Sequence, residues 1–493
     1  MAQSSMSMEA GLPADEKRLA RSGAARPDAG IVHLGLGAFY RAFGAVYVED
    51  AVRISGGDWG IIGVSLQSPG TRDRLAPQDF VYTVVAQNPD GGETFRKVEI
   101  VQDVLVAPED PEAVLNAMSD PAIRIVTLTV TEKGYCHDPA TGALNFDHPD
   151  IIHDLEAALP RSAPGFLVRA LERRRDAGHP PFTVLTCDNL PENGRLVRRA
   201  VLDLAGRLDP ALADWIASDG RFPSTMVDRI TPATKPEDID RLAQKIGYRD
   251  EAPVLCEPFR QWVIEDDFVP AYGAEARPDL AAAGAEMVAD VTPYENMKLR
   301  MLNGTHSSLA YLGYLGGHET IAETVADPVF AGYVKRLWRD EIIPSFTAPE
   351  GVDLEAYADA LFERYSNPSI RHRTWQIAMD GSQKLPQRIL ATITDNLAAG
   401  RECPGLMLAV AGWMRYVGGV DEKGQPIEVK DPLADKLRAL SDAAGATEQK
   451  VAGLLGVREV FSARLSAQLA APVTEVYGHV TALGARKAIE GML

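Results

Sequence analysis

The chain has 493 residues, more than the roughly 250–300 at which a single hydrophobic core stops growing, so two domains are expected. Hydrophobic residues make up 46% and charged residues 24%, which is typical of an ordinary globular protein. The formal net charge of −19 argues against a nucleic-acid backbone or an anionic membrane as the main partner. An anionic substrate would then need a local basic site.

The N-terminal residues 1–29 contain no apolar core and are interpreted as a loose leader rather than a signal peptide. No apolar run approaches the roughly 20 residues that cross a bilayer, so no membrane partner is expected. Four cysteines occur without a CxxC pair, and no His cluster has metal-ligand spacing. This indicates a reducing compartment, taken here as the cytoplasm, and predicts no metal site. The oligomeric state stays open, and a monomer is compatible with the sequence.

Short apolar runs alternate with helical patterns over the first part of the chain. The expected strands are 31–34, 61–66, 98–106, 123–130 and 182–185, and the expected helices are 39–52, 111–118 and 165–175. This alternation predicts βαβ units and a mostly parallel sheet. From about Tyr294 onward, amphipathic helical patterns dominate, as at 328–341, 354–365 and 433–443. We therefore expect an α/β first domain over residues 30–285 and a mainly α-helical C-terminal domain over residues 286–493.

A glycine pair, Gly35 and Gly37, follows the first expected strand and opens the first expected helix. Such glycines allow a tight turn and let a dinucleotide pyrophosphate approach the helix N-terminus. The third glycine of the usual fingerprint is absent, with Tyr40 in its place, so a plain strand–helix turn is the alternative. The acidic residue that usually ends the second strand is also missing. NADP thus stays open beside NAD, and Arg72 would either accept a phosphate or be a solvated loop residue.

The run from Lys298 to His306 brings an ammonium, an amide and an imidazole into nine residues of an apolar helical pattern. At about 100° per residue, Asn303 lies roughly 140° and His306 roughly 80° around from Lys298, so one helix face can present all three. A buried lysine loses solvation, and its pKa falls toward the range of a general base. Such a group can exchange a proton with an alcohol or ketone during hydride transfer. The alternative is an amphipathic helix with one exposed lysine and two satisfied polar residues.

Six motifs occur in a fixed order along the chain. They are GLGAFYRAF at 35–43, TVTEKGY at 129–135, CDNLPENG at 187–194, MVDRI at 226–230, CEPF at 256–259 with ED at 265–266, and KLRMLNGTH at 298–306. Together they resemble the polyol-specific long-chain dehydrogenases, the mannitol dehydrogenase family. Tyr40 and Phe43 depart from that family, which usually has histidines there. The resemblance implies a Rossmann-like NAD-binding domain at 30–285 and a helical substrate domain at 286–493.

Within the family, the segment RHRTWQIAMDGSQKLP at 371–386 and the Pro69-Gly70 end of the second strand resemble the members that reduce D-fructuronate to D-mannonate. The Pro-Gly ending implies NAD. A uronate carboxylate favours a forked guanidinium or a nearby ammonium. The cationic candidates for binding it are Arg371, His372, Arg373 and Lys384, unless they form a solvated basic turn. A mannitol 2-dehydrogenase, a tagaturonate reductase and a non-catalytic dinucleotide-binding protein are the competing interpretations.

The resemblance also implies roles for single residues. Lys298 is implied to be the catalytic acid/base, with Asn189 and Asn303 donating N–H groups to the developing alkoxide in place of a metal. His306 would hold a substrate hydroxyl or orient the lysine. Asp228 would bind substrate hydroxyls, unless it only pairs with Arg229, and Glu132 would relay protons or cap a loop. The cofactor-binding residues implied are Gly35, Gly37, Phe39, Arg41, Thr129, Thr131 and Glu132.

Overall fold

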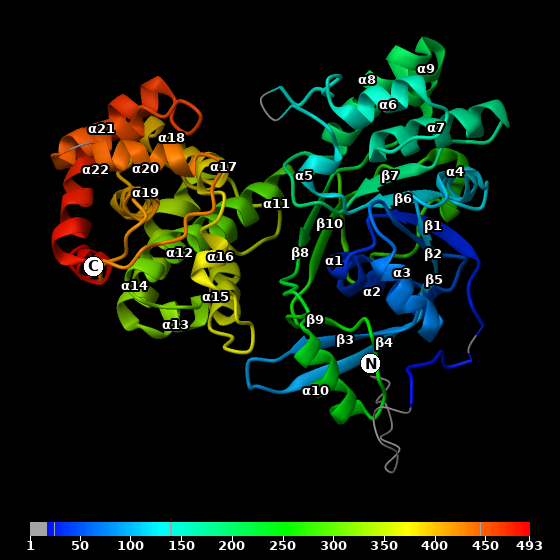
Figure 1. The fold of residues 1–493 in the computed structure, drawn as a ribbon, viewed down its shortest axis with the longest axis horizontal. Helices are drawn as coiled ribbons and strands as arrows, with labels where there is room; N and C mark the ends of the chain where they lie inside the picture. Colours follow the sequence, from blue (N-terminus) through cyan, green and yellow to red (C-terminus); the bar gives the residue numbers. More distant parts are fainter. Residues whose placement is uncertain (1–16, 24, 139–140, 444) are drawn as a thin grey trace. The chain divides into compact units, whose positions relative to one another are not determined.

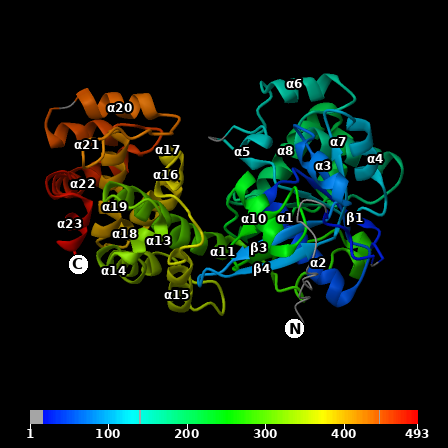
Figure 2. The same ribbon diagram turned by 60° about the horizontal axis from the view of Figure 1, so that its bottom comes forward.

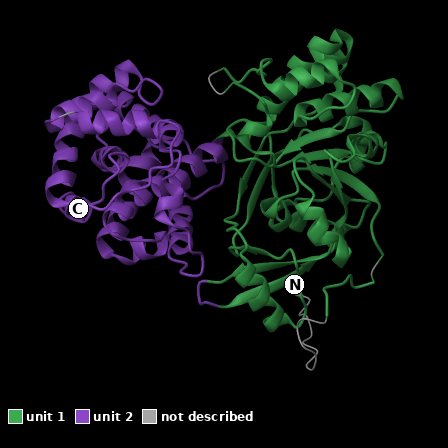
Figure 3. Ribbon diagram, viewed as in Figure 1, with its two compact units in different colours: residues 1–88, 92–292 green, residues 89–91, 293–493 purple. Residues whose placement is uncertain are grey.

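The computed structural model describes residues 17–23, 25–138, 141–443 and 445–493. Most of the predicted leader, residues 1–29, therefore lies outside the described residues. The chain divides into unit 1, residues 1–88 and 92–292, and unit 2, residues 89–91 and 293–493 (Figure 3). Within the described ranges, every helix is too short or too polar to cross a lipid bilayer.

Unit 1 is built on a five-stranded parallel sheet with the order β5-β2-β1-β6-β7 (Figure 1). The strands are β1 (Ala29–Leu34), β2 (Gly60–Ser65), β5 (Val101–Val106), β6 (Ile125–Leu128) and β7 (Thr183–Thr186). Counted within this sheet, the order is 3-2-1-4-5, which is the order of a doubly wound dinucleotide-binding sheet. The predicted parallel α/β domain is confirmed.

Both faces of this sheet are covered by helices (Figures 1 and 2). On β1, Ile31 belongs to the core shared with α1 (Ala38–Ala42) and α2 (Gly44–Ser55). Val32 and Leu34 belong to the core shared with α4 (Pro111–Ser119), α7 (Ala163–Asp176) and α8 (Asn193–Leu208). Successive side chains of a strand point to opposite faces, so both faces of a doubly covered strand are buried, and the polar His33 of β1 is buried with its apolar neighbours.

The predicted helix over residues 39–52 is wrong in one respect, because Phe43 interrupts it. Phe43 has φ −121° and ψ −85° and separates α1 from α2. Its ring packs against Phe39, Tyr47 and Trp262, with ring centroids 5.0–5.5 Å apart. Phe39 lies in α1 and Tyr47 in α2, but Trp262 lies in a strand more than two hundred residues away. Helical periodicity alone therefore could not reveal the break.

The predicted strand over residues 98–106 is also divided, between the end of β4 and the whole of β5. Unit 1 has two further sheets of three short strands each, with orders β4-β3-β9 and β11-β10-β8. Their strands are β3 (Tyr82–Gln87), β4 (Glu93–Val98), β8 (Thr225–Asp228), β9 (Val254–Cys256), β10 (Gln261–Glu265) and β11 (Glu286–Val288). The remaining helices are α3 (Gly70–Leu75), η1 (Ala76–Gln78), α5 (Thr131–Gly134), α6 (Pro149–Glu156), α9 (Pro210–Asp219), α10 (Pro236–Ile246) and η2 (Pro270–Glu275).

Unit 2 is helical, as predicted, and its core surrounds α12 (Thr305–Leu315) and α19 (Pro404–Val417). Both helices are buried on nearly every face, as expected for helices enclosed by others. The other α-helices are α11 (Thr292–Met297), α13 (Ile321–Ala326), α14 (Pro328–Arg336), α15 (Leu354–Tyr365), α16 (Thr374–Ile377), α17 (Gly381–Leu385), α18 (Ala391–Ala398), α20 (Ala434–Ala443), α21 (Thr447–Leu455), α22 (Ala463–Leu483) and α23 (Ala485–Glu490). Three segments are π-helical, η3 (Lys298–Gly304), η4 (Leu337–Ile342) and η6 (Pro386–Leu390), and η5 (Ile343–Ser345) is a 3-10 turn.

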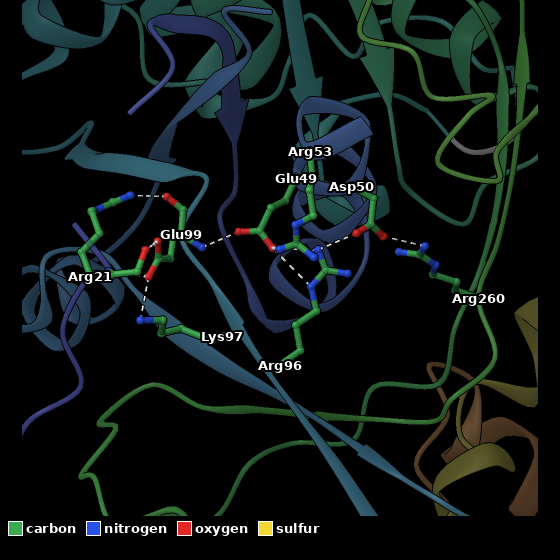
Figure 4. A network of polar contacts seen from close by, with 9 residues as sticks. Arg21, Glu49, Asp50, Arg53, Arg96, Lys97, Glu99 and Arg260 are labelled. Atoms are coloured by element: carbon green, nitrogen blue, oxygen red, sulfur yellow. Dashed lines mark hydrogen bonds and ion pairs between the residues drawn. The ribbon is translucent and has the colours of Figure 1, made fainter. Parts of the chain in front are cut away.

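A network of charged side chains in unit 1 joins the N-terminal segment, α2, β4 and the segment before β10 (Figure 4). Its centre is Glu49, which accepts from the Arg96 guanidinium at 2.7 Å and from the backbone N–H of Glu99 at 2.6 Å. Asp50, the next residue of α2, accepts from Arg96 at 2.8 Å and from Arg260 at 2.7 Å. Two adjacent carboxylates of one helix therefore anchor two separate parts of the chain.

We expect Glu49→Gln to destabilise unit 1. The substitution keeps the shape but turns an N–H group toward Arg96 and leaves a half-buried guanidinium short of a partner. The expected loss is about 2–4 kcal/mol in the free energy of unfolding. Differential scanning calorimetry would show a melting temperature lower by roughly 3–7 °C. The exposed Glu237→Gln is the matched control, and equal melting temperatures for both variants would contradict the assignment.

Candidate active site

The turn after β1 has the geometry of a phosphate-binding turn. Gly35 has φ +90°, and its N–H and that of Leu36 both donate to the Val64 carbonyl of β2. A Cβ at Gly35 would collide with the carbonyl oxygen of Thr129, so only glycine fits there. Gly37 is exposed and forms the N-cap of α1, where backbone N–H groups are unsatisfied by the helix itself.

The position of the missing third glycine is filled by a packed aromatic ring. The Tyr40 ring stacks on the His33 imidazole with ring centroids 3.4 Å apart and an interplanar angle of 8°. Space for this ring comes from Gly44, where a Cβ would collide with it. The close helix–strand approach that the third glycine usually allows is thus replaced by a stacked pair, with the glycine four residues later.

A hydrogen-bonded chain under the turn holds the His33 ring in place. The Thr129 hydroxyl donates to the Gly35 carbonyl at 2.8 Å and lies 2.9 Å from His33 Nε2. His33 Nδ1 lies 2.8 Å from the Thr127 hydroxyl, which in turn donates to the Tyr40 hydroxyl at 3.2 Å. Burial lowers the pKa of His33 to about 3, so the ring is neutral at ordinary pH. Thr129 therefore supports the glycine turn from below.

The loops after β6 and β7 are tied together by the buried carboxylate of Asp188. It accepts from the backbone N–H groups of Val130 and Thr131, both at 3.0 Å, and from the Tyr135 hydroxyl at 2.7 Å. Burial raises the pKa of this carboxyl group. Thr131 has φ +64°, a strained conformation for a β-branched residue. Exposed side chains next to this anchor include Glu132 and Asn189, at the carboxyl edge of the sheet where α/β enzymes bind ligands.

The loop that carries Asn189 is also joined to β8. The buried Asn193 side chain donates to the carbonyls of Asp188 and Thr225 at 2.9 and 2.8 Å and accepts from the Thr225 N–H at 2.9 Å. Asp228 ends the same strand and is buried. Asn193 thus links the loop carrying Asn189 to the strand that ends at Asp228.

Two arginines near this site bind backbone carbonyls. Arg229 donates to the Glu257 carbonyl at 2.9 and 3.1 Å and to the Ala42 carbonyl at 2.6 Å. Arg41 is buried and donates to the Ala252 carbonyl at 2.5 Å. These contacts hold α1 against the small sheets of unit 1. The ring of Phe39 stacks on Phe43 within the same helix pair.

Arg72 lies at the start of α3, beyond the end of β2, where a 2′-phosphate would be recognised. Its guanidinium is paired with Asp73 at 2.8 Å and with Glu109. These two carboxylates neutralise the guanidinium charge that would attract a phosphate, and they repel a further anion. This arrangement favours NAD over NADP.

Lys298 begins a π-helix rather than the α-helix that the 100° periodicity assumed, so the predicted angular offsets of Asn303 and His306 are wrong. The structure buries Lys298 and His306, each 7% exposed, and leaves Asn303 half-buried. A π-helix hydrogen-bonds i to i+5, is rare, and is found frequently at functional sites. Of the two alternatives for this lysine, exposed or buried, the structure has the buried one.

The π-helix is stabilised by side chains of unit 2 that satisfy its displaced carbonyls. The Met301 carbonyl accepts from Trp338 Nε1 at 2.8 Å and from the Thr305 hydroxyl at 2.5 Å. The Leu302 carbonyl accepts from the Tyr365 hydroxyl at 2.8 Å. Backbone groups that lose their usual helical partners must be paired in a buried place. Donors from η4 and α15 therefore determine this local geometry.

His306 packs between two rings. Its imidazole lies 5.2 Å from the Tyr365 ring and 4.7 Å, edge to face, from the His372 ring. Burial, and then the positive charges around it, hold the pKa of His306 well below its ordinary value. Those neighbours are His372, Arg388, Arg364 and Lys384. A neutral His306 can hydrogen-bond a substrate hydroxyl but carries no charge at neutral pH.

The four cationic candidates of segment 371–384 are separated by the structure. Arg371 and Arg373 are 69% and 52% exposed and lie 3.7 and 3.5 Å from Glu319. His372 and Lys384 are half-buried beside His306. Burial, with the neighbouring Arg388, lowers the pKa of Lys384 to about 8, and burial lowers that of His372 to about 4.

Two residues at the site did not stand out in the sequence. Arg388 lies in η6, whose backbone approaches η3 so closely that a Cβ at Gly304 would come within 2.6 Å of the Arg388 carbonyl oxygen. The sequence pattern that could have revealed Arg388 is its four-residue spacing from Lys384, which places both residues on one helix face. Asp188 was seen only as part of a motif, because nothing in the sequence shows that its carboxylate turns inward.

The described cysteines are all free and buried. One of them, Cys136, lies with His148 and Asp150 in a group whose possible ligand atoms are within 4.8 Å of one another. His148 Nδ1 accepts from the Asp150 N–H at 3.3 Å, and burial raises the pKa of the Cys136 thiol to about 12. The Nδ1 lone pair of His148 is thus engaged by this backbone N–H.

Comparison with known proteins accounts for both units. Residues 29–274 match the Mannitol dehydrogenase Rossmann domain, and residues 290–481 match the Mannitol dehydrogenase C-terminal domain. The chain is 47% identical over 474 residues to D-mannonate oxidoreductase of Escherichia coli K12, covering 95% of this chain and 96% of that protein. It is 40% identical over 441 residues to mannitol 2-dehydrogenase of Pyricularia oryzae, covering 88% and 86%.

Two solved dehydrogenase structures resemble this chain over nearly its whole length. Pseudomonas fluorescens mannitol 2-dehydrogenase, in a ternary complex with NAD and D-mannitol, matches with a TM-score of 0.82 and 36% identity, over 98% of this chain and 95% of that one. D-sorbitol dehydrogenase in a substrate-free form matches with a TM-score of 0.84 and 35% identity, over 94% and 95%. Since these matches cover nearly the whole chain, the protein belongs to the mannitol dehydrogenase family.

Proposed function

We propose that this protein is an NAD-dependent oxidoreductase that interconverts D-fructuronate and D-mannonate. The observation that carries the proposal is the group of basic side chains around His306 in unit 2, eight residues after the buried Lys298, in a chain of net charge −19. A hexitol has no charge to offset such a group, whereas a uronate does. The 47% identity to a D-mannonate oxidoreductase supports the same substrate class.

The residues of unit 1 fit a dinucleotide. At Gly37 an added Cβ would meet only the Gly35 carbonyl oxygen, at 3.7 Å, so the backbone here is open to an approaching pyrophosphate. We assign Gly35, Gly37 and Phe39 to the cofactor, with Arg41 and Thr129 supporting the turn. Residues Thr131 and Glu132 are proposed to line the nicotinamide end. NAD is the proposed cofactor, because Arg72 is already paired with two carboxylates.

The cofactor, when bound, donates hydride to the ketone carbon or accepts it from the alcohol. Lys298 is the proposed proton donor to the developing alkoxide and the base in the reverse direction. Asn189 and Asn303 are proposed to donate N–H groups to that oxygen, as an oxyanion hole does. His306 and Asp228 are proposed to bind substrate hydroxyls. Glu132, exposed on α5, remains a candidate for proton relay.

Two substrates compete with fructuronate. Mannitol 2-dehydrogenases are relatives at about two-fifths identity, which keeps fructose reduction as the second candidate function. Tagaturonate has the same carboxylate and differs in one hydroxyl configuration. We further propose that residues 30–285 and 286–493 serve cofactor and substrate respectively. The four buried free cysteines suit a cytoplasmic location.

The proposal is tested by oxidation assays with NAD, in parallel on D-mannonate, D-altronate and D-mannitol, following NADH at 340 nm. Turnover of mannonate with kcat/KM at least tenfold above the other two is expected. A preference for mannitol would replace fructuronate by fructose as the ketose substrate. A preference for altronate would identify a tagaturonate reductase. Repeating the best reaction with NADP checks the cofactor assignment.

A further inference from the structure

Unit 2 contains a cluster of basic side chains gathered around His306. Its members are His306, His372, Lys384 and Arg388, with Arg364 as a further positive neighbour of His306. They come from three separate parts of the chain, α12, the segment before α16, and the pair α17–η6. His306 and His372 are in ring contact, and Arg388 donates to the hydroxyl of Ser307, which follows His306. Lys384 precedes Arg388 by four residues in the adjoining helices α17 and η6.

The cluster is not neutralised by acidic side chains. In the described part of the chain, no carboxylate oxygen lies within 4.0 Å of the Lys384 ammonium or the Arg388 guanidinium. The nearest acidic influences on Lys384 are Asp380 and Asp431. Asp431 is engaged by Ser382, accepting from its N–H at 2.7 Å and its hydroxyl at 2.6 Å. Burying uncompensated cations is costly, so such a group is expected to receive an anion.

Arg388 is the member best suited to bind a carboxylate. A guanidinium has five N–H donors in a planar fork, and within the described ranges the side chain of Arg388 makes one hydrogen bond, from Nη1 to the Ser307 hydroxyl at 3.2 Å. Lys384 instead has its ammonium on the Met379 carbonyl at 2.6 Å. Ser307 follows His306 directly, so this contact holds the guanidinium next to the proposed hydroxyl-binding histidine.

The lack of a side chain at Gly304 lets η6, which carries Arg388, pack closely against η3. The two π-helices η3 and η6 pack together, and a side chain at Gly304 would separate them. Lys298 begins one of these helices and Arg388 lies in the other. The proton donor and the guanidinium are thereby placed on two elements in direct contact. A six-carbon uronate, with ketone and carboxylate toward opposite ends of its chain, has the matching chemistry.

We propose that Arg388, oriented by Ser307 and assisted by Lys384, binds the substrate carboxylate and selects uronates over uncharged ketoses. This proposal rests on the proposed function and identifies which basic residue recognises the acid. Under this proposal the exposed Arg371 and Arg373, which lie near Glu319, do not contact the substrate carboxylate.

The test compares Arg388→Gln and Arg388→Lys with wild type, using D-fructuronate and D-fructose with saturating NADH. Arg388→Gln is expected to lower kcat/KM for fructuronate at least 30-fold, mainly by raising KM, and to change the value for fructose less than threefold. Arg388→Lys should recover part of the loss, because it restores charge without the fork. The exposed Arg339→Gln is the matched control, and Arg371→Gln and Arg373→Gln are run beside it.

An equal fall on both substrates would overturn the proposal, since it would mean that Arg388 only supports the fold. So would a selective loss in Arg371→Gln or Arg373→Gln with Arg388→Gln unaffected. If wild type reduces no fructuronate, the proposed function fails, and the anion site is then tested by calorimetric binding of D-mannonate and D-mannitol to the NAD-loaded protein. Mannonate binding that is lost in Arg388→Gln would sustain the site, whereas no preference for mannonate would refute it.

Discussion

Replacing Lys298 with alanine is expected to lower kcat for ketone reduction by about 10²–10⁴-fold, the usual contribution of a positioned general acid. Lys298 is buried at the first turn of η3, where water cannot readily replace its proton. Lys298→Arg keeps the positive charge but not the readily donated proton, so it should be almost as impaired. The measurement is single-turnover NADH oxidation with substrate at saturation.

Binding of NADH separates this catalytic loss from misfolding. Titration by nucleotide fluorescence should give the same Kd for wild type and Lys298→Ala, because the proposed cofactor residues belong to unit 1. The surface Lys436→Ala, which loses a pair with Glu459, is the control and should keep full activity. If Lys298→Ala retained kcat within tenfold of wild type, another group would have to be the proton donor.

Alanine at Gly35 and at Gly37 should have contrasting effects. At Gly35 the substitution forces φ +90° on an L residue and a collision with the Thr129 carbonyl, so both stability and NADH binding should fall. The strain alone is worth about 1–3 kcal/mol. At Gly37, φ is −97° and the nearest atom to a Cβ is 3.7 Å away, so the fold should be unaffected.

The expected result for Gly37→Ala is therefore an unchanged melting temperature with NADH Kd raised at least tenfold, because the new methyl group would stand where the pyrophosphate approaches. Thermal melting and nucleotide titration on the same two preparations check this. Wild-type NADH affinity in Gly37→Ala would place the pyrophosphate elsewhere. A stable Gly35→Ala protein would show that the turn relaxes without cost.

Much of the fold follows from local patterns. The five parallel strands were found because each is a short apolar run next to a turn, and Gly35 and Gly37 lie where strand and helix patterns meet. The break at Phe43 and the small sheets could not be read this way. They depend on contacts such as that of Phe43 with Trp262, between residues far apart in the chain.

The site was predictable in its residue types and less so in its geometry. Lys298, Asn303 and His306 were identified by spacing, but the π-helix that carries them exists because Trp338 and Tyr365 satisfy its carbonyls. A basic residue's burial also depends on tertiary packing. The sequence pattern gives no reason to distinguish Arg371 from Lys384. In the structure Arg371 is exposed near Glu319, whereas Lys384 is half-buried near His306.

A uronate, bound with its ketone at Lys298, is the proposed preferred substrate. A competition experiment tests it most directly: equal concentrations of D-fructuronate and D-fructose, limiting NADH, and mass-spectrometric measurement of mannonate against hexitol. The product ratio equals the ratio of the two kcat/KM values and does not depend on enzyme concentration. We expect a product ratio of at least ten mannonate molecules per hexitol molecule. An excess of hexitol would contradict it and would identify the enzyme as a polyol dehydrogenase.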